Sequence, residues 1–278
     1  MNIIDGRKIK EEILNELKSK VEALSFPPIF CDILVGDDPS SLQYVRMKAK
    51  IAESIGIKFK SVSFPESATV EEVIEEIENL NKVPHMCGVI IQLPLPKNSN
   101  IDTQVVLDMI DSKLDVDCLG SVNSRNFYGD TGSIGYPTAL ACMKLLDSID
   151  LDLKNKNIAV LGRGKLVGLP VTHILESRGF KVNVVHTQTE NSNEIIKNAD
   201  VIISALGRGK FLTGDMVKEG VVIIDAGTSE ENGSVVGDVD MDSVSLKASY
   251  ITPTPGGVGP VTVAMLLENV VRVAQNKK

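Results

Sequence analysis

The stretch that decides the fold is Lys156–Thr187, "KNIAVLGRGKLVGLPVTHILESRGFKVNVVHT". An apolar run of strand length comes first, then a turn with three glycines, then a helical pattern and a second apolar run. Glycines between a strand and a helix let the backbone approach a pyrophosphate, which would sit at the helix N-terminus. The spacing of Gly162, Gly164 and Gly168 is one residue longer than the usual dinucleotide pattern, so the turn alone is a weak signal.

The end of the second apolar run indicates which dinucleotide fits. NAD sites usually carry an acidic residue there, which binds the ribose 2′-hydroxyl. Here the run ends with His186 and Thr187, and Arg163 lies in the glycine turn. An arginine and a hydroxyl can hold a 2′-phosphate that an acid would repel, so we expect NADP rather than NAD. Arg163 as a solvated loop charge is the alternative interpretation.

Apolar runs and helical patterns alternate along the rest of the chain as well. The runs are continuous rather than alternating, which is typical of parallel strands covered on both faces. The pattern restarts near Tyr136. We therefore expect an α/β fold with two α/β domains and a cleft between them. Residues 1–137 plus 260–278 would form a catalytic domain, and residues 138–259 a Rossmann-type dinucleotide domain.

Composition narrows the class of protein. The chain has 278 residues, of which 43% are hydrophobic and 24% charged, and a net charge of −8 without a basic cluster, which argues against a nucleic-acid partner. The charged, amphipathic start predicts no signal peptide, and no apolar run reaches the length of a membrane span. The four scattered cysteines favour reduced thiols, a cytoplasmic location and no metal site.

One residue of the helix expected after Pro39 is out of place. In "SSLQYVRMKAKIAESIGI", Lys48 falls in the middle of the apolar face. Burial disfavours a charged ammonium, so an inward amine is a candidate acid or base. A stem that packs inward while its ammonium reaches water is an equally good interpretation from the residues alone. Tyr44 lies one turn earlier on the same face, where it can meet Lys48 or serve as an ordinary core tyrosine.

Other candidate residues lie at the ends of apolar runs. Gln92 ends the run "GVIIQ", at the strand edge where ligands gather, and can hydrogen-bond Lys48 or simply face solvent. Asp115 and Asp117 have the spacing of ordinary turn aspartates. The loop "PGGVGP" at 255–260 lets backbone approach a ligand closely, or merely begins the last helix.

Together these motifs resemble the bifunctional methylenetetrahydrofolate dehydrogenase/cyclohydrolase family, the FolD family, over nearly the whole chain. "SSLQYVRMKAK" resembles its Ser-x-x-Tyr-Val-x-x-Lys-x-Lys segment, "LDVDCLGSVN" its Lys-Asp-Val-Asp-Gly-Phe-x-x-x-Asn and "GRGKLVGLP" its Gly-Arg-Ser-x-x-Val-Gly-x-Pro. "GVIIQLPLP", "GDVD" and "TPTPGGVGP" match further signatures, and the first and last are the most specific. Cys118 stands where the family usually has Gly, Gly164 where it has Ser, and "YPTA" at 136–139 replaces a Pro-Cys-Thr-Pro string.

The resemblance implies two reactions and a set of site residues. Methylenetetrahydrofolate would give a hydride to NADP⁺, and water would then open the methenyl product to 10-formyltetrahydrofolate. The implied catalytic residues are Lys48, Tyr44, Gln92 and Asp117, with Lys48 as acid/base, Tyr44 against the pterin or aminobenzoyl ring and Asp117 on the pterin's amino-pyrimidine edge. The cofactor residues are expected to be Gly162, Arg163, Gly164, Val167, Gly168, His186 and Thr187. The substrate-binding residues are expected to be Tyr44, Gln92, Asp117, Gly256, Gly257, Val258 and Pro260.

The resemblance further implies a homodimer in one-carbon metabolism and purine biosynthesis, with tetrahydrofolate derivatives as substrates. Alternatives are a monofunctional NAD-dependent dehydrogenase and another two-domain dehydrogenase of the shikimate or amino-acid type. The second of these leaves the Gln-Leu-Pro string unexplained. A non-catalytic dinucleotide-binding regulator is disfavoured, because a buried amine costs stability without a use.

Overall fold

The computed structural model describes residues 1–231 and 233–277 and divides them into two compact units. Unit 1 holds Met1–Glu11 and Thr138–Met265, and unit 2 holds Glu12–Pro137 and the chain from Leu266 onward. The division falls within helices α1 (Gly6–Glu22) and α10 (Val258–Gln275), so each helix contributes residues to both units. Residues 1–11, which we expected to belong with residues 12–137, are part of unit 1 because the first strand joins its sheet.

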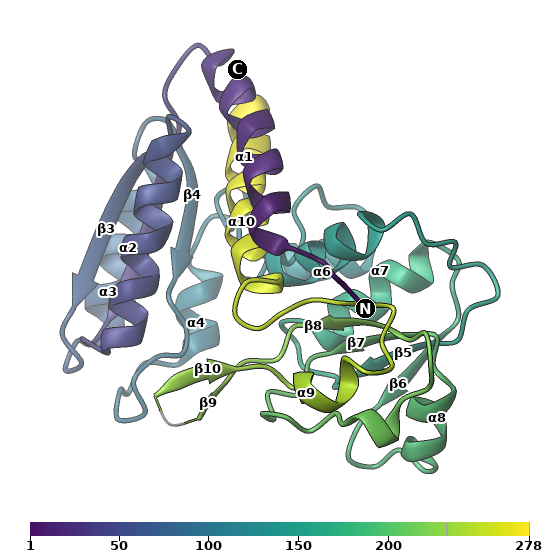
Figure 1. The fold of residues 1–278 in the computed structure, drawn as a ribbon. Helices are drawn as coiled ribbons and strands as arrows, with labels where there is room; N and C mark the ends of the chain where they lie inside the picture. The colour runs from purple at the N-terminus through teal and green to yellow at the C-terminus, as the bar shows by residue number, and fades with distance from the viewer. Residues whose placement is uncertain (232, 278) are drawn as a thin grey trace. The chain divides into compact units, whose positions relative to one another are not determined.

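Unit 1 is built on a six-stranded sheet whose neighbouring strands are all parallel (Figure 1). In spatial order the strands are β1 (Asn2–Ile3), β11 (Tyr250–Ile251), β8 (Val222–Asp225), β7 (Val201–Ser204), β5 (Ile158–Leu161) and β6 (Val182–Val185). The strands β5, β7 and β8 are buried at every residue, which explains their continuous apolar sequence. The predicted α/β architecture is confirmed.

The remaining elements of unit 1 are short. They are α6 (Pro137–Asp147), α7 (Gly168–Ser177), α8 (Ser192–Asn198), the 3₁₀-helix η1 (Gly214–Met216), α9 (Met241–Val244) and an antiparallel hairpin of β9 (Ser229–Glu231) and β10 (Ser234–Val236). Helix α7 packs against β5 and β6, directly after the glycine turn. The glycine turn therefore lies at the carboxyl end of β5, which is an interior strand of the sheet.

Unit 2 has a three-stranded parallel sheet in the order β3 (Lys58–Phe64), β2 (Ile29–Val35) and β4 (Met86–Ile91). Its other helices are α2 (Pro39–Ser54), α3 (Val70–Asn81), α4 (Thr103–Asp108) and α5 (Ser121–Tyr128). The chain moves one way across the sheet through α2 and back through α3. Because such crossovers are right-handed, α2 and α3 cover opposite faces, and the middle strand β2 is buried between them.

Local sequence explains why α2 begins where it does. Oδ2 of Asp38 accepts hydrogen bonds from the backbone N–H of Ser41 (2.8 Å) and the hydroxyl of Ser40 (2.5 Å), and Pro39 occupies the first turn. Gly56, at φ +88°, follows the helix in the left-handed region that suits glycine. The cap fixes the start of the helix and so decides which residues face the sheet.

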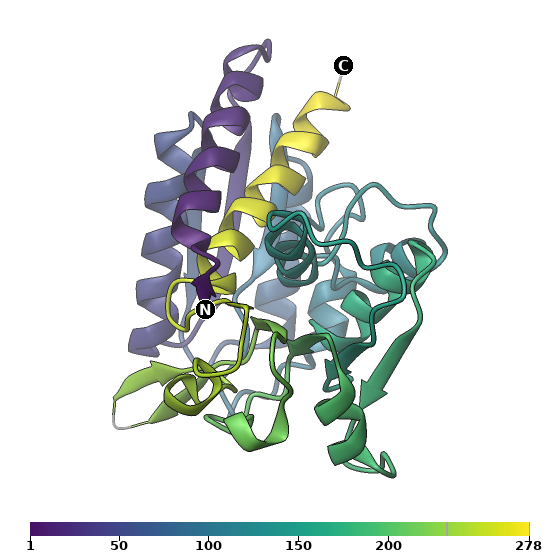
Figure 2. The same cartoon turned by 45° about the vertical axis from the view of Figure 1, so that its right-hand side comes forward.

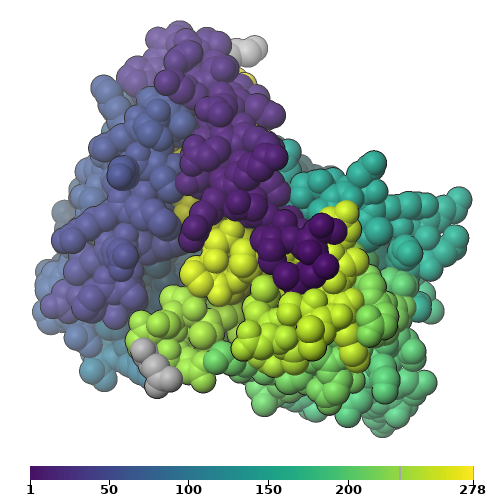
Figure 3. All heavy atoms as spheres, viewed as in Figure 1, coloured from purple at the N-terminus to yellow at the C-terminus, as the bar shows by residue number. Residues whose placement is uncertain are grey.

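Helices α1 and α10 run side by side, as Figure 2 shows. In unit 2, α1 buries Ile13, Leu17 and Val21 and leaves the polar residues between them exposed. The exposed side of α1 forms part of the purple surface in Figure 3. The side-chain amide of Asn269 in α10 donates to the carbonyls of Val116 and Gly135, both at 2.8 Å. The last helix thereby holds a segment that comes more than a hundred residues earlier in the chain.

Three further features bear on the class of protein. No helix within the described ranges has the length and apolar content needed to cross a bilayer. The four cysteines are free and buried. In the part of the chain that the structure describes, no three His, Cys, Asp or Glu residues gather closely enough to hold a metal ion.

Candidate active site

Lys48 points into unit 2 from the inner face of α2, as the apolar pattern predicts. Its side chain is 2% exposed, which rejects the interpretation that the ammonium reaches water. Nζ donates a hydrogen bond to Oε1 of Gln92 at 2.7 Å and lies 2.5 Å from Oδ2 of Asp32. The amine is therefore held between the middle strand of the sheet and the residue that follows β4.

Asp32 is the partner that the sequence prediction missed. It lies in β2 and is fully buried, and none of the described residues donates a hydrogen bond to its Oδ1. Burial raises the pKa of its carboxyl, while the Lys48 ammonium acts in the opposite direction. The signal was a single charged residue in the otherwise apolar run "IFCDILV", which is costly unless a buried partner meets it.

Gln92 and Tyr44 complete the surroundings of the amine. Nε2 of Gln92 donates to the carbonyl of Leu93 at 2.7 Å, which leaves Oε1 directed at Lys48. The centre of the Tyr44 ring lies 4.9 Å from Nζ, within cation–π range. Burial, with the nearby carboxylates, raises the pKa of Tyr44 to about 12, so its hydroxyl keeps its proton. The predicted contacts of Lys48 with Gln92 and with Tyr44 are both confirmed.

Asp117 lies in the segment between α4 and α5, within electrostatic reach of Lys48. Burial raises its pKa to about 7, Lys48 opposes this shift, and the carboxylates of Asp115 and Asp32 add to it. Asp115 itself is buried and accepts hydrogen bonds from the backbone N–H groups of Leu119 (3.3 Å) and Gly120 (2.9 Å). Asp115 therefore shapes the loop, and Asp117 is the half-buried carboxylate that can meet a ligand.

We call Lys48, Asp32, Gln92, Tyr44 and Asp117 the Lys48 cluster. All five belong to unit 2. The cluster offers an amine shielded from bulk water, a carboxylate and an amide oxygen that fix it, and an aromatic face beside it. A shielded amine of this kind can exchange a proton with a bound reactant, which is the requirement for general acid–base catalysis.

The glycine turn of unit 1 depends on two of its three glycines. Gly162 has φ +99°, and a Cβ there would lie 2.5 Å from the carbonyl oxygen of Ala205. A Cβ on Gly168 would lie 2.2 Å from the carbonyl oxygen of Gly162. Gly164 is open, with no atom within 4 Å of a Cβ. Helix α7 begins at Gly168 after Val167, and no side chain caps it, so its first N–H groups suit a pyrophosphate.

Arg163 links the glycine turn to the end of β6. Its Nη2 donates to Oε1 of Gln188 at 3.4 Å, and the side chain is exposed. Nδ1 of His186 accepts a hydrogen bond from the backbone N–H of Gln188 at 3.2 Å, so His186 helps to shape this loop. Thr187 is exposed beside it. The structure thus brings the predicted 2′-phosphate residues to one region of unit 1.

The expected substrate loop, residues 255–260, belongs to unit 1, whereas the Lys48 cluster belongs to unit 2. Gly256 has φ +113°, and a Cβ on Gly257 would lie 2.6 Å from the carbonyl oxygen of Pro253, so both positions need glycine. Val258 is buried, and α10 begins there. Pro260 falls in the first turn of α10, where proline is tolerated.

Two buried carboxylates shape the loops at the carboxyl edge of the unit 1 sheet. Asp238 accepts hydrogen bonds from the hydroxyl of Ser204 and from two backbone N–H groups, all at 2.7 Å. Asp225 accepts from three backbone N–H groups at 3.0–3.1 Å, and burial raises its pKa to about 6. Nucleotides bind at this edge in open α/β sheets, so these carboxylates hold in place the loops that a cofactor would contact.

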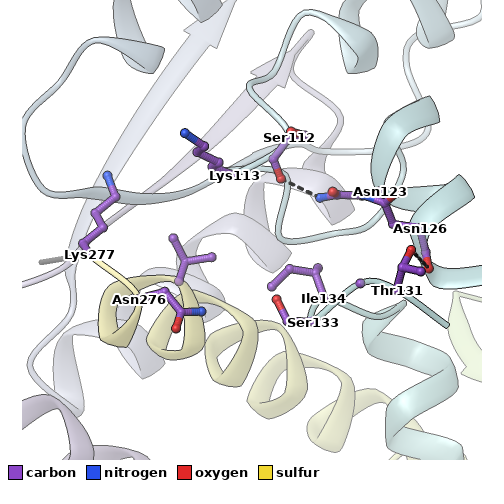
Figure 4. A pocket seen from close by; sticks show the side chains of 11 residues that line it. Ser112, Lys113, Asn123, Asn126, Thr131, Ser133, Ile134, Asn276 and Lys277 are labelled. Carbon is purple, nitrogen blue, oxygen red and sulfur yellow. Dashed lines mark hydrogen bonds between the residues drawn. The ribbon is translucent and has the colours of Figure 1, made fainter.

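A pocket of about 680 Å³ opens elsewhere in unit 2 (Figure 4). Its lining is mostly polar and includes Asn123, Asn126, Thr131 and Asn276. The amide of Asn123 already donates to the carbonyl of Ser112 at 2.8 Å, the contact drawn in Figure 4. No member of the Lys48 cluster lines this pocket. The pocket is therefore separate from the chemistry described above.

A parallel sheet with a glycine turn before a helix defines unit 1 as an α/β dinucleotide-binding fold. Comparison with family models places most of the chain. Residues 4–117 match the catalytic domain of tetrahydrofolate dehydrogenase/cyclohydrolase, and residues 136–278 match the NAD(P)-binding domain of the same family. The chain belongs to the tetrahydrofolate dehydrogenase/cyclohydrolase family, which confirms the resemblance found in the sequence.

Individual relatives agree with the family models. The chain is 41% identical over 280 residues to the bifunctional protein FolD of Nautilia profundicola, covering 99% of this chain and 98% of that one. The crystal structure of the bifunctional FolD enzyme from Campylobacter jejuni covers 100% of both chains with a TM-score of 0.95 and 40% identity. The Trypanosoma brucei FolD structure, a complex with NADP cofactor and inhibitor, has a TM-score of 0.91 and 35% identity over 98% of this chain and 97% of that one.

Proposed function

We propose that this protein oxidises 5,10-methylenetetrahydrofolate to 5,10-methenyltetrahydrofolate with NADP⁺ and hydrolyses the product to 10-formyltetrahydrofolate. Family membership and relatives named as bifunctional support both activities. The single observation that carries the hydrolytic half is the buried amine of Lys48, held by Gln92 and Asp32. A dehydrogenase alone would have no use for such an amine, because hydride transfer needs mainly alignment of the two reactants.

Four residues of the Lys48 cluster have a proposed part in the hydrolysis. Lys48 takes a proton from the water that attacks the cationic methenyl carbon. Gln92 holds the amine in place, and the face of the Tyr44 ring supports the folate beside it. Asp117, in its carboxylate form, accepts hydrogen bonds from the amino-pyrimidine edge of the pterin. Gly256, Gly257, Val258 and Pro260 are proposed to contact the substrate as well.

The dinucleotide site is proposed to lie on the glycine turn. NADP⁺, when bound, supplies the hydride acceptor. The turn fits a pyrophosphate because Gly162 and Gly168 leave no room for side chains and the start of α7 is uncapped, and Gly164 and Val167 complete the turn. Arg163 and Thr187, next to His186, would hold the 2′-phosphate, and the tip of β6 carries no acidic residue that would repel it.

The wider setting is proposed on the same family basis. Residues 12–137 with the end of α10 are proposed to be the catalytic domain, and residues 138–259 with the first strand the cofactor domain. We propose a cytoplasmic homodimer that provides 10-formyltetrahydrofolate for purine biosynthesis. Light scattering at several protein concentrations tests the dimer, and a mass of 30.0 kDa at all of them would contradict it.

Two assays on the purified protein test the function. Formation of reduced cofactor from methylenetetrahydrofolate, with NADP⁺ or NAD⁺, measures the dehydrogenase, and we expect NADP⁺ to be strongly preferred. Loss of methenyltetrahydrofolate without any cofactor measures the hydrolysis. Dehydrogenase activity without hydrolysis would favour the monofunctional alternative, a preference for NAD⁺ would overturn the role of Arg163, and neither activity would favour a regulator.

A further inference from the structure

A buried aspartate at position 32 costs folding free energy through desolvation. The strand β2 runs through the middle of its sheet, and the other residues from Phe30 to Val35 are apolar and buried. A buried ion pair often gains less than it loses in desolvation, and a well-packed apolar pair is commonly as stable or more so. A valine at position 32 would suit the strand better. The carboxylate is therefore better explained by what it does to Lys48 than by stability.

The titratable groups around Lys48 come from three segments of the chain. Asp32 reaches it from β2, Asp117 from the segment after α4, and the Tyr44 ring lies beside it on α2 itself. Gln92, from the end of β4, is neutral. Among the described residues, only Asp32 forms an ion pair with Nζ, through Oδ2 at 2.5 Å. The Oδ1 of Asp32 receives no hydrogen bond from the described chain, so this carboxylate is directed at the amine alone.

We propose that Asp32 is a positioning residue for the hydrolysis step, which orients the Lys48 amine and stabilises the ammonium that forms when the amine takes a proton from the attacking water. The inference rests on the proposed function. In the step, a C–O bond forms at the methenyl carbon, an O–H bond of water breaks, and the proton goes to Nζ. The positive charge leaves the folate and reappears on Lys48, 2.5 Å from the carboxylate.

The arrangement follows the logic of a serine protease triad, in which a buried aspartate stabilises the histidine cation that forms during the reaction. Charge stabilisation of this kind is effective because the partner is already in place and shielded from water. The same carboxylate also stabilises the ammonium before the reaction begins. Removal of the charge should therefore have two opposite effects.

Asp32→Asn tests the proposal with kcat for hydrolysis, measured at saturating methenyltetrahydrofolate across pH. We expect the half-maximal pH to fall by about 1–3 units, the usual effect of an opposite charge at this range. We expect the plateau at high pH to fall about tenfold or more, because the amine becomes a weaker base. A structural defect alone would lower the plateau without moving the half-maximal pH.

Controls separate Asp32 from its neighbours. The charge of Asp32 also raises the pKa of Asp117. Because Asp117 is proposed to bind folate in both reactions, an effect of the substitution through Asp117 would shift the pH profile of the dehydrogenase equally. Cys31→Ala changes the preceding residue of the same strand, whose side chain points to the other face of the sheet. We expect the half-maximal pH of hydrolysis to stay unchanged in this variant. If Asp32→Asn does not fold, Asp32→Val removes the same charge with a residue suited to a strand.

The outcomes distinguish this inference from the proposed function. A wild-type protein that does not hydrolyse methenyltetrahydrofolate would overturn the proposed function. A wild-type protein that does, with a folded Asp32 variant whose half-maximal pH is unchanged, would overturn only the role of Asp32. A dehydrogenase profile that shifts together with the hydrolysis profile would do the same.

Discussion

The Lys48 cluster presents side-chain atoms that are fixed by burial, whereas the glycine turn presents backbone N–H groups that are left accessible by missing side chains. In the cluster, an amine, a carboxylate and an amide meet within 2.5–2.7 Å. In the turn, Gly162 and Gly168 each lie so close to a backbone carbonyl that an added Cβ would collide with it. The first region therefore depends on which side chains are present, and the second on which are absent, so substitutions should separate the two activities.

The largest effect is expected from Lys48→Met. Hydrolysis should fall by ~10²–10⁴-fold, the usual contribution of a general base, while hydride transfer persists. The variant also leaves Asp32 buried without its partner, at a cost of ~3–5 kcal/mol in the free energy of unfolding. Lys48→Met/Asp32→Val should recover most of that stability in chemical denaturation without recovering hydrolysis. Near wild-type hydrolysis in either variant would remove Lys48 from its role.

Gly168→Ala should disrupt NADP⁺ binding at the glycine turn. Its Cβ would lie 2.2 Å from the carbonyl oxygen of Gly162, so the turn has to move, at a cost of about 3 kcal/mol or roughly 100-fold in NADP⁺ affinity. Titration of NADP⁺ binding measures the loss, and hydrolysis should stay intact. Gly164→Ala is the matched control, since its Cβ meets nothing within 4 Å. Equal losses in the two variants would contradict the proposed geometry.

Arg163→Ala sharpens the choice of cofactor. A charged hydrogen bond to a phosphate is worth ~1.5–3 kcal/mol, so kcat/KM for NADP⁺ should fall about 10- to 100-fold, while the value for NAD⁺ changes little. Arg178→Ala removes another exposed arginine of unit 1, which pairs with Asp147 at 2.8 Å, and serves as the control. Equal losses with both cofactors would show that Arg163 does not read the 2′-phosphate.

A smaller effect is expected from pH on folate binding. The pKa of Asp117 is raised to about 7, so this carboxyl gains a proton as pH falls through 7 and loses its ability to pair with the pterin. In the dehydrogenase assay, kcat/KM for methylenetetrahydrofolate should fall about five- to tenfold between pH 7 and pH 6. Asp117→Asn should give a lower and flatter profile. An unchanged slope in that variant would assign the titration to another group.

Cys118→Gly should change least. Cys118 has φ +62°, a region that costs a side-chain-bearing residue about 1 kcal/mol, and its buried thiol recovers a similar amount. The two terms nearly cancel, so we expect the free energy of unfolding to shift by less than about 1 kcal/mol. The backbone conformation also explains why glycine suits this position. A loss of several kcal/mol would mean that the contact of the thiol with the carbonyl of Ile134 matters more than its length of 3.7 Å suggests.

The sequence was informative where the controlling interactions are local. Helix α2, its inward Lys48 and the contact with Tyr44 follow from helical spacing, and the glycine turn follows from residue type. Strand β1 was missed because its two residues pair with β11, near the other end of the chain. The helices α4 and α5 and the hairpin β9–β10 are too short to show a clear period.

The same distinction explains the site. Gln92 was predicted because the end of a strand is a property of the nearby sequence. Asp32 was missed because its meaning depends on a partner sixteen residues later, across a helix–sheet interface. A lone charge inside an apolar run was visible, but only the three-dimensional pairing with Lys48 shows why it is tolerated.

The two hydrogen bonds of Asn269 have a consequence for protein synthesis. One of them ties α10 to Val116, the residue just before Asp117, and 153 residues separate its donor from its acceptor. While the ribosome is still making unit 1, the earlier part of unit 2 has its three strands but lacks the helix that secures this loop. We expect the loop that carries Asp117 to stay unsecured in the nascent chain until α10 has been made.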